Sequence, residues 1–328
     1  MLYVHGIGHF HPENIIDNAF LESLEINTTE QWIMKYVGVR TRRTVLPLDY
    51  IYRQRNGDRR AAEEAAIYSN EATGEKAARM ALDRAGLDPS DIGLVVSGSS
   101  APAHTSPAEA CLIASKLNIG VPGFDLGSAC TTFVAQLRLL ALIQPDALPD
   151  FVLVVAPENL TRVVDYTDRS TAVLMGDCTI AAVVSARVPA RLRIVQIEFE
   201  SNPAASRTVT IPATGYLRQD GAAVQVFAIK KTAEMFRRLK GKAAGTPYLV
   251  GHQANLVMLR AVCARAEVTS DRHLYNVDDY GNCGAAGSAS VISQFWNNLK
   301  DGDEICLAVV GAGLSWGGAL LKYTASPS

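Results

Sequence analysis

The feature that most constrains the fold is a regular alternation of short apolar runs with amphipathic helical patterns. In the first half these segments follow one another at residues 2–8, 71–85, 92–97, 106–117, 123–126, 130–143, 151–156 and 179–185. The same rhythm returns at residues 193–199, 221–239, 248–250, 255–264, 285–299, 305–310 and 318–322. Such alternation is typical of an α/β protein in which helices cover the strands.

The two series resemble each other, and no linker rich in Pro, Gly or Ser separates them. For a chain of 328 residues, this predicts one compact body with internal pseudo-symmetry. We place the halves at residues 1–187 and 188–328. A richly charged stretch at 47–70 is interpreted as a surface excursion within the first half.

Composition excludes several classes of protein. The 31 Lys and Arg residues nearly balance 33 Asp and Glu residues, which argues against nucleic-acid binding through bulk positive charge. The N-terminus lacks the pattern of a signal peptide, and the apolar run Ile305–Leu321 is too short and too rich in Gly for a membrane span. The six cysteines form no C-x-x-C pair, so we expect no metal site and a reduced, cytoplasmic protein.

Cys130 is the first candidate for chemistry. The segment Asp125–Phe133 joins a predicted strand to a predicted helix and places Cys130 at the helix N-terminus. The helix dipole there, about half a charge, favours a thiolate. Unpaired backbone N–H groups at this end could also hold an oxyanion. The alternative is a small buried side chain, which is the commonest role of a free cysteine.

His252 and Asn282 are the other two candidates. His252 follows an apolar strand and precedes a helix, a position where α/β proteins gather their sites. It could act as a base or donate to an oxyanion, or it could be a hydrogen-bonded structural residue. Asn282 could point its amide into a cavity, although Gly281-Asn282 also reads as a simple turn. Together, a thiol, an imidazole and an amide suffice for acyl transfer through a thioester and for stabilising an enolate.

These motifs resemble those of the β-ketoacyl-acyl-carrier-protein synthase III family of the thiolase superfamily. The resemblance runs from the first strand to the last, and each motif stands in the family's order. The matching stretches are Trp32–Arg40, the segment around Cys130, Asp168-Arg169, Met175–Asp177, His252–Asn255, Gly281–Ala286 and Gly311–Gly317.

The resemblance implies a thiolase-like α/β fold of five layers, α-β-α-β-α, built from two pseudo-duplicated halves and usually found as a homodimer. It implies that Cys130 takes an acyl group from a thioester. His252 and Asn282 then bind the second thioester while malonyl-carrier protein loses carbon dioxide and attacks the acyl group. The backbone N–H groups of Cys130 and Ala312 would form the oxyanion hole. The partners would be acyl carrier protein and acyl thioesters, with no metal and no other cofactor.

Substrate contacts carried over from the family fall on Trp32, Arg169 and Asn255, which would bind coenzyme A or pantetheine. Tyr36 and Val257 stand where family members that use short acyl-CoA carry basic residues. Their loss would weaken contacts to the coenzyme A phosphates, although Trp32 and Arg169 could still sandwich an adenine. We therefore expect carrier-protein thioesters or unusual donors.

Ser106 stands where the family often has a bulky Phe that reaches across the dimer and closes the acyl pocket. A small residue there predicts a longer acyl tunnel. We therefore expect a medium-chain or unusual primer in a specialised fatty-acid or polyketide pathway.

Four basic residues lie on one predicted helix and are candidates for docking the acidic carrier protein. They are Lys230, Lys231, Arg237 and Arg238. The alternative is an ordinary solvated helix face.

Four rival interpretations stay open. In the nearest, the same fold moves an acyl group from Cys130 to a non-malonyl acceptor without decarboxylation. A Cys-His-Asn hydrolase or transglutaminase would need the cysteine in another local pattern. A silent scaffold subunit would usually have lost one of the three residues. A thiolase proper would want a second cysteine near Gly311–Gly313, where there is none.

Overall fold

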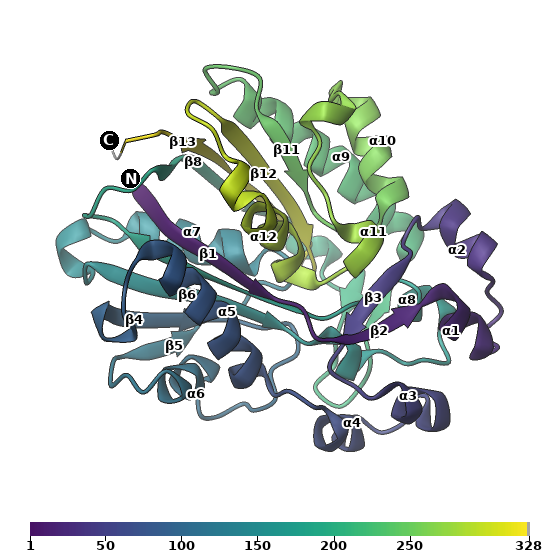
Figure 1. The fold of residues 1–328 in the computed structure, drawn as a ribbon. Coiled ribbons are helices and arrows are strands. Elements are labelled where there is room, and N and C mark those ends of the chain that lie inside the picture. The colour runs from purple at the N-terminus through teal and green to yellow at the C-terminus, as the bar shows by residue number, and fades with distance from the viewer. Residues whose placement is uncertain (327–328) are drawn as a thin grey trace.

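A computed structural model describes residues 1–326 and contains a sheet of nine strands (Figure 1). The first half supplies β1 (Leu2–Phe10), β4 (Ile92–Ser97), β5 (Gly123–Asp125), β6 (Phe151–Glu158) and β7 (Cys178–Ser185). The second half supplies β8 (Leu192–Ser201), β11 (Tyr248–Gly251), β12 (Glu304–Gly311) and β13 (Ser315–Tyr323). Two small ribbons lie outside this sheet: β2 (Asn14–Asp17) with β3 (Thr41–Thr44), and β9 (Val209–Thr210) with β10 (Arg218–Gln219).

The strand order β11-β12-β13-β8-β1-β7-β6-β4-β5 shows the internal duplication. In the first half, β4 runs parallel to β5 and β6, while β7 and β1 return antiparallel. In the second half, β11 and β12 are parallel, and β13 and β8 return antiparallel. The halves join where Leu2–Val4 of β1 pairs with residues 192–194 of β8. The predicted boundary at 187/188 falls in the connection between β7 and β8.

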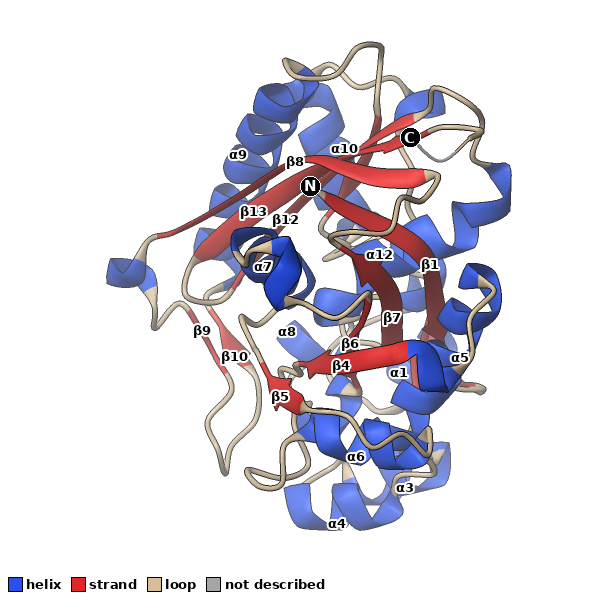
Figure 2. Ribbon diagram, turned by 90° about the vertical axis from the view of Figure 1, so that its left-hand side faces the viewer, coloured by secondary structure: helices blue, strands red, loops and turns tan. Residues whose placement is uncertain are grey.

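Helices form three layers around the strands, as predicted (Figure 2). The central helices α7 (Thr132–Leu142) and α12 (Gly284–Phe295) contact each other and strands of both halves. Residues 284–293 of α12 are all buried, and a helix that is apolar or small on every side belongs inside a protein. The outer layers contain α5 (Asn70–Ala85) with α6 (Glu109–Lys116), and α9 (Gly221–Lys240) with α10 (Leu256–Ala266).

Close packing of α5 on β1 depends on two glycines. A Cβ atom on Gly6 would lie 2.1 Å from the Ala81 carbonyl oxygen, and one on Gly8 would lie 2.1 Å from that of Ala77. Any side chain here would push the outer helix off the sheet. The remaining short helices are α1 (Asn18–Ser23), α2 (Glu30–Tyr36), α3 (Leu48–Gln54), α4 (Arg59–Ala65), α8 (Arg169–Ala172) and α11 (Val277–Tyr280).

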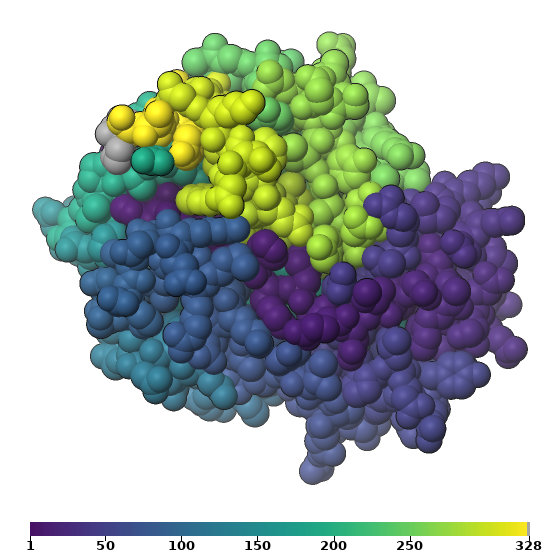
Figure 3. Space-filling model, in the orientation of Figure 1, coloured from purple at the N-terminus to yellow at the C-terminus, as the bar shows by residue number. Residues whose placement is uncertain are grey.

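Three local expectations need correction. The helix expected from residue 106 begins at Glu109, where the Asp125 carboxylate accepts the backbone N–H groups of Glu109 and Ala110. The helix expected from Cys130 begins at Thr132. The 47–70 excursion is more than solvated surface, because it folds into α3 and α4 and buries Ile51 and Asn56. In Figure 3 its dark-blue residues form a protrusion at the lower edge of the molecule.

Candidate active site

The three predicted side chains line one cavity of about 290 Å³. Cys130 comes from the turn before α7, His252 from the end of β11, and Asn282 from the turn before α12. Three further residues predicted to take part in the site line the same cavity: Ala312, Trp32 and Asn255. Much of the remaining wall is apolar, including Val209, Leu217, Val224, Phe227 and Leu314.

A strained turn holds Cys130. Ala129 has a left-handed φ of +47°, a backbone conformation that residues with a side chain adopt infrequently and at a cost in free energy. Thr132 stabilises this turn, because its hydroxyl donates to the Ala129 carbonyl (2.7 Å) and accepts the Ser128 N–H (2.8 Å). Cys130 therefore sits two residues before the first helical residue, with its side chain lining the cavity.

The protonation state of Cys130 differs from the thiolate that the helix dipole was expected to favour. Burial and, to a smaller extent, the nearby Glu158 carboxyl together raise the pKa of the thiol to about 12. The helix dipole does not outweigh these effects, so the resting group is a thiol and not a thiolate. Acylation therefore needs a base that removes the proton as the sulfur attacks.

His252 has the properties of such a base. Burial lowers its pKa to about 4, so the imidazole is neutral at pH 7. Its Nδ1 atom is buried and has no hydrogen-bond partner among residues 1–326. The neighbouring Gln253 fixes the local backbone: its amide donates to the Gly251 carbonyl (2.7 Å) and its oxygen accepts the Asn276 N–H (3.1 Å).

Asn282 is oriented by three bonds. Its backbone N–H donates to Leu174 (2.8 Å), and its backbone carbonyl accepts the Gly176 N–H (3.0 Å). The side-chain oxygen accepts the Gly284 N–H (3.0 Å), which leaves the Nδ2 group as the free donor. Gly281-Asn282 is thus the expected turn, with Gly281 at a φ of +70°, and Asn282 is also part of the cavity wall.

Two backbone N–H groups near the cavity are free of backbone acceptors, which an oxyanion site requires. Neither Cys130 nor Ala312 donates to a backbone carbonyl in the turns and loops of the described chain. The two segments are in contact, because a Cβ atom on Gly311 would lie 3.1 Å from the Cys130 nitrogen.

The two side chains predicted to sandwich an adenine contact each other directly in this structure. The Arg169 guanidinium lies 4.5 Å from the centre of the Trp32 ring, so the two side chains stack on each other. A ring inserted between them would have to separate them first. Asn255 lines the cavity, and its side chain also caps α10 by accepting the Met258 N–H (2.7 Å). Tyr36 is exposed at the surface.

Ser106 is exposed on the irregular loop before α6 and does not line the cavity within this single chain. Its predicted role across a dimer stays a prediction.

The basic residues of α9 are only partly available for docking. Lys231 pairs with Glu234 (3.2 Å), and Arg238 pairs with Glu198 (2.9 Å) and Glu200 (2.6 Å). Such pairs reduce the net positive charge of the face. Lys230 and Arg237 are exposed and form no ion pair with an acidic residue among residues 1–326.

Glu158 is the residue that sequence reasoning missed. It ends the buried strand β6, and its carboxyl contacts the Ser100 N–H (3.1 Å), the Ser100 hydroxyl (3.0 Å) and the Ala285 N–H (3.3 Å). It therefore ties the loop after β4 to the first turn of α12, directly beyond Asn282. Burial raises its pKa to about 8. An acid that closes an otherwise apolar strand is the signal that could have found it.

Comparison with known proteins agrees with the fold and the motifs. The family described as 3-Oxoacyl-[acyl-carrier-protein (ACP)] synthase III matches residues 124–203, and its C-terminal model matches residues 241–323. A β-ketoacyl-acyl-carrier-protein synthase III of Coxiella burnetii (strain RSA 331 / Henzerling II) is 30% identical, over 97% of this chain and 98% of the relative.

Solved structures give the same result. The 3-oxoacyl-acyl-carrier-protein synthase III of Aquifex aeolicus VF5 has a TM-score of 0.86 and 27% identity, covering 98% of this chain and 100% of that one. The priming β-ketosynthase of the R1128 polyketide biosynthetic pathway has a TM-score of 0.82 and 27% identity, covering 100% of this chain and 97% of that one.

The fold and these matches define a condensing enzyme of the thiolase superfamily. Within that superfamily, the chain belongs to the β-ketoacyl-acyl-carrier-protein synthase III family. In residues 1–326, no helix combines the length and apolar character needed to cross a membrane.

Proposed function

We propose that this enzyme loads an acyl group on Cys130 and condenses it with malonyl-carrier protein. The observation that carries the proposal is the convergence of Cys130, His252 and Asn282 on one largely apolar cavity. Each group has a form suited to its role: a neutral thiol, a neutral imidazole and an amide whose free donor is Nδ2.

In the loading step, His252 takes the thiol proton while the Cys130 sulfur attacks the thioester carbonyl. The carbon–sulfur bond of the donor breaks, and the proton leaves with the released thiol. The backbone N–H groups of Cys130 and Ala312 bind the oxyanion, and a donor of this kind is typically worth about 10²–10³ in rate.

In the condensation step, the neutral His252 and the Asn282 Nδ2 group donate to the carbonyl oxygen of malonyl thioester. Loss of carbon dioxide leaves its electron pair as an enolate on the remaining thioester. The enolate carbon attacks acyl-Cys130, and the carbon–sulfur bond to Cys130 breaks to give the β-ketoacyl product. Cys130 leaves as a thiolate and takes one proton from solvent to return to the thiol. The substrates supply the other atoms and all the electrons, so the proposed reaction needs no metal or other cofactor.

The substrate is proposed to be a medium-chain or unusual primer of a specialised fatty-acid or polyketide pathway, carried on acyl carrier protein. The small Ser106, the exposed Tyr36 and the absence of a basic residue at Val257 support this proposal. The similarity to the R1128 priming β-ketosynthase also supports it. We also propose that the enzyme is a homodimer and that carrier protein docks near Lys230 and Arg237.

The test is the intact mass of the protein after incubation with acyl-CoA and acyl-carrier-protein thioesters, followed by malonyl-carrier protein. We expect an acyl adduct that the Cys130→Ala variant does not form, and its loss with release of a β-ketoacyl product. An adduct that ignores malonyl-carrier protein would instead indicate transfer to a non-malonyl acceptor. No adduct with any donor would contradict a catalytic role for Cys130.

A further inference from the structure

Residues 47–66, which we call the α3–α4 strap, are anchored to the body of the enzyme at three places. The first anchor is the turn between the two helices. Asn56 is fully buried there, and its side-chain amide donates to the carbonyls of Thr161 (3.2 Å), Arg162 (3.1 Å) and Val164 (2.7 Å). These carbonyls belong to the chain that follows strand β6, so the strap is attached beside the strand end that carries Glu158.

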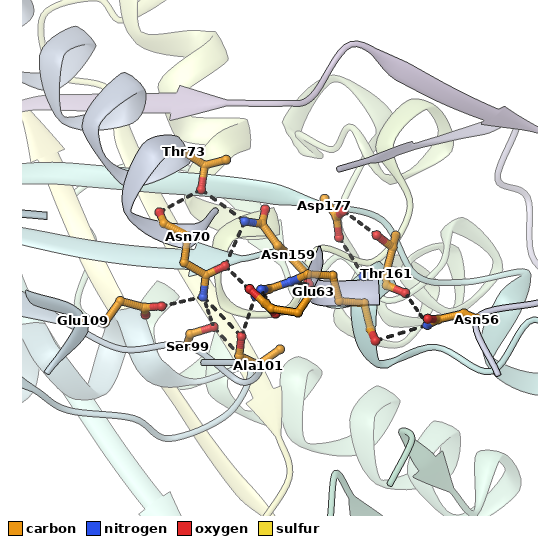
Figure 4. Close-up of polar contacts among 11 residues, drawn as sticks. Asn56, Glu63, Asn70, Thr73, Ser99, Ala101, Glu109, Asn159, Thr161 and Asp177 are labelled. Carbon is orange, nitrogen blue, oxygen red and sulfur yellow. Dashed lines mark hydrogen bonds and ion pairs between the residues drawn. The ribbon is translucent and has the colours of Figure 1, made fainter. Parts of the chain in front are cut away.

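The second anchor is an ion pair between Glu63 of α4 and Arg162, whose side chain is only 3% exposed. On the buried side, the Arg162 guanidinium donates to the Asn70 side-chain oxygen (2.7 Å) and to the Ala101 carbonyl (2.8 Å). Figure 4 shows how Asn56 and Glu63 meet this buried polar network, in which Asn159 also donates to Asn70 (2.8 Å).

The third anchor reaches the wall of the catalytic cavity. The Arg59 Nη1 group donates to the carbonyls of Pro212 (3.0 Å), Ala213 (2.8 Å) and Gly215 (3.0 Å). These residues form the loop between β9 and β10, which extends towards α4 in Figure 2. Two residues beyond this contact, Leu217 lines the catalytic cavity.

The β9–β10 ribbon needs such support. Each strand has two residues, and a two-stranded ribbon is marginally stable at best on its own. Nevertheless, Val209 of β9 and Gln219 of β10 both line the catalytic cavity. Two further hydrogen bonds attach the ribbon and its loop to the segment 163–170: the Leu217 N–H donates to the Val163 carbonyl (2.9 Å), and the Gln219 side-chain amide donates to the Ser170 carbonyl (3.3 Å).

We propose that Arg59 is a specificity-determining positioning residue of this enzyme. It holds the β9–β10 loop closed as one wall of the thioester cavity and so limits the size of the acyl thioester that fits. This inference rests on the proposed function, because the cavity must bind an acyl thioester for its wall to select one. Arg59 acts only through the loop, and it does not itself line the cavity.

The kinetic test compares Arg59→Ala with Arg60→Ala. Arg60 is a matched control because it is adjacent, its side chain is 88% exposed, and it pairs with Glu64 of its own helix. If the β9–β10 loop is in its closed position for only a fraction of the time, the apparent affinity for the acyl thioester falls in proportion to that fraction. For Arg59→Ala we expect KM for the preferred acyl thioester to rise about three- to tenfold with kcat within about twofold. Relative kcat/KM should shift towards branched or bulkier acyl groups, and Arg59→Lys should restore part of the loss.

Hydrogen exchange tests the same proposal without any turnover. Amides of residues 209–220 should exchange faster in Arg59→Ala than in the wild type, and Arg60→Ala should match the wild type. Unchanged exchange, or faster exchange with an unchanged KM and acyl-group preference, would overturn the proposal. If the wild-type chain takes no acyl group at all, the proposed function fails, and the exchange data alone then decide whether Arg59 holds the loop.

Discussion

Replacing Glu158 with Gln tests whether a neutral carboxyl lies near the Cys130 thiol. The amide oxygen can take the place of Oε2, which accepts the Ser100 N–H, and the NH₂ group can take the place of Oε1 beside the Ser100 hydroxyl. Only the longer contact from the Ala285 N–H (3.3 Å) is lost. The variant therefore imitates the protonated form of Glu158 and cannot ionise.

The expected effect on stability follows from the pKa. Burial raises the pKa of Glu158 from 4.5 to about 8. A carboxyl whose folded pKa is raised adds stability below pH 4.5, and this stability is lost as the pH rises towards 8. The loss is about 1.4 kcal/mol per pH unit inside this interval, or about 3 kcal/mol between roughly pH 5.5 and 7.5. The variant cannot ionise at this position and does not lose this stability. The free energy of unfolding of the variant, relative to that of the wild type, should therefore increase as the pH rises.

The assay is urea unfolding of both proteins at several pH values between about 5 and 8. Glu64→Gln is a control, because Glu64 is exposed and pairs only with Arg60 in the described ion pairs. Its curve should run parallel to that of the wild type. Parallel curves for Glu158→Gln as well would refute the reasoning, since Glu158 would then ionise equally in the folded and unfolded chains.

The same variant should change the chemistry of Cys130. Because the Glu158 carboxyl contributes to the raised pKa of the thiol, its removal should lower the pH at which iodoacetamide alkylates Cys130. An unchanged alkylation profile would show that the two groups are not coupled.

Three further predictions concern the cavity. Gly311→Ala places a Cβ atom 3.1 Å from the Cys130 nitrogen, so the rate of loading of Cys130, measured by stopped-flow acylation, should fall about 10²-fold. Gly120→Ala is the control and should not change this rate, because a Cβ atom there would have no atom within 4 Å. Asn282→Ala should lower malonyl decarboxylation about 10²-fold or more while the acyl adduct still forms by mass, and loss of both would contradict separate roles. Burial lowers the pKa of His252 to about 4, so its contribution to stability is present above pH 6.5 and lost as the pH falls towards 4. His252→Gln should therefore flatten the acid limb of the urea-unfolding profile, and an unchanged limb would contradict a buried neutral imidazole.

Much of the fold and the three residues of the proposed active site could be predicted, because both leave signals in short stretches of sequence. A helix or strand is recognised from its own periodicity, and α9 was expected at 221–239 and is found at Gly221–Lys240. The motifs around Cys130, His252 and Asn282 each stand at a junction of two elements, where the chain has to turn. Their order along the chain matched one family, and the fold then brought all three to one cavity.

Other properties could not be predicted because they depend on distant neighbours. The sequence shows Arg59 only as one charge in a charged stretch, but its three acceptors lie about 150 residues away, at 212–215. Trp32 and Arg169 were expected to be able to sandwich an adenine, and their direct contact in this structure depends on side-chain placement. The start of α6 at Glu109 depends on a carboxylate from β5.

The sequence by itself therefore determined the α/β architecture, the family and the residues that can react. Only the tertiary structure decided their protonation and the shape of the space between them. The dipole at the start of α7 favours a thiolate, but burial and Glu158 keep Cys130 a thiol. The physical reason is that a pKa depends on how much water and which charges surround a group, and those are set by segments that meet only when the chain has folded.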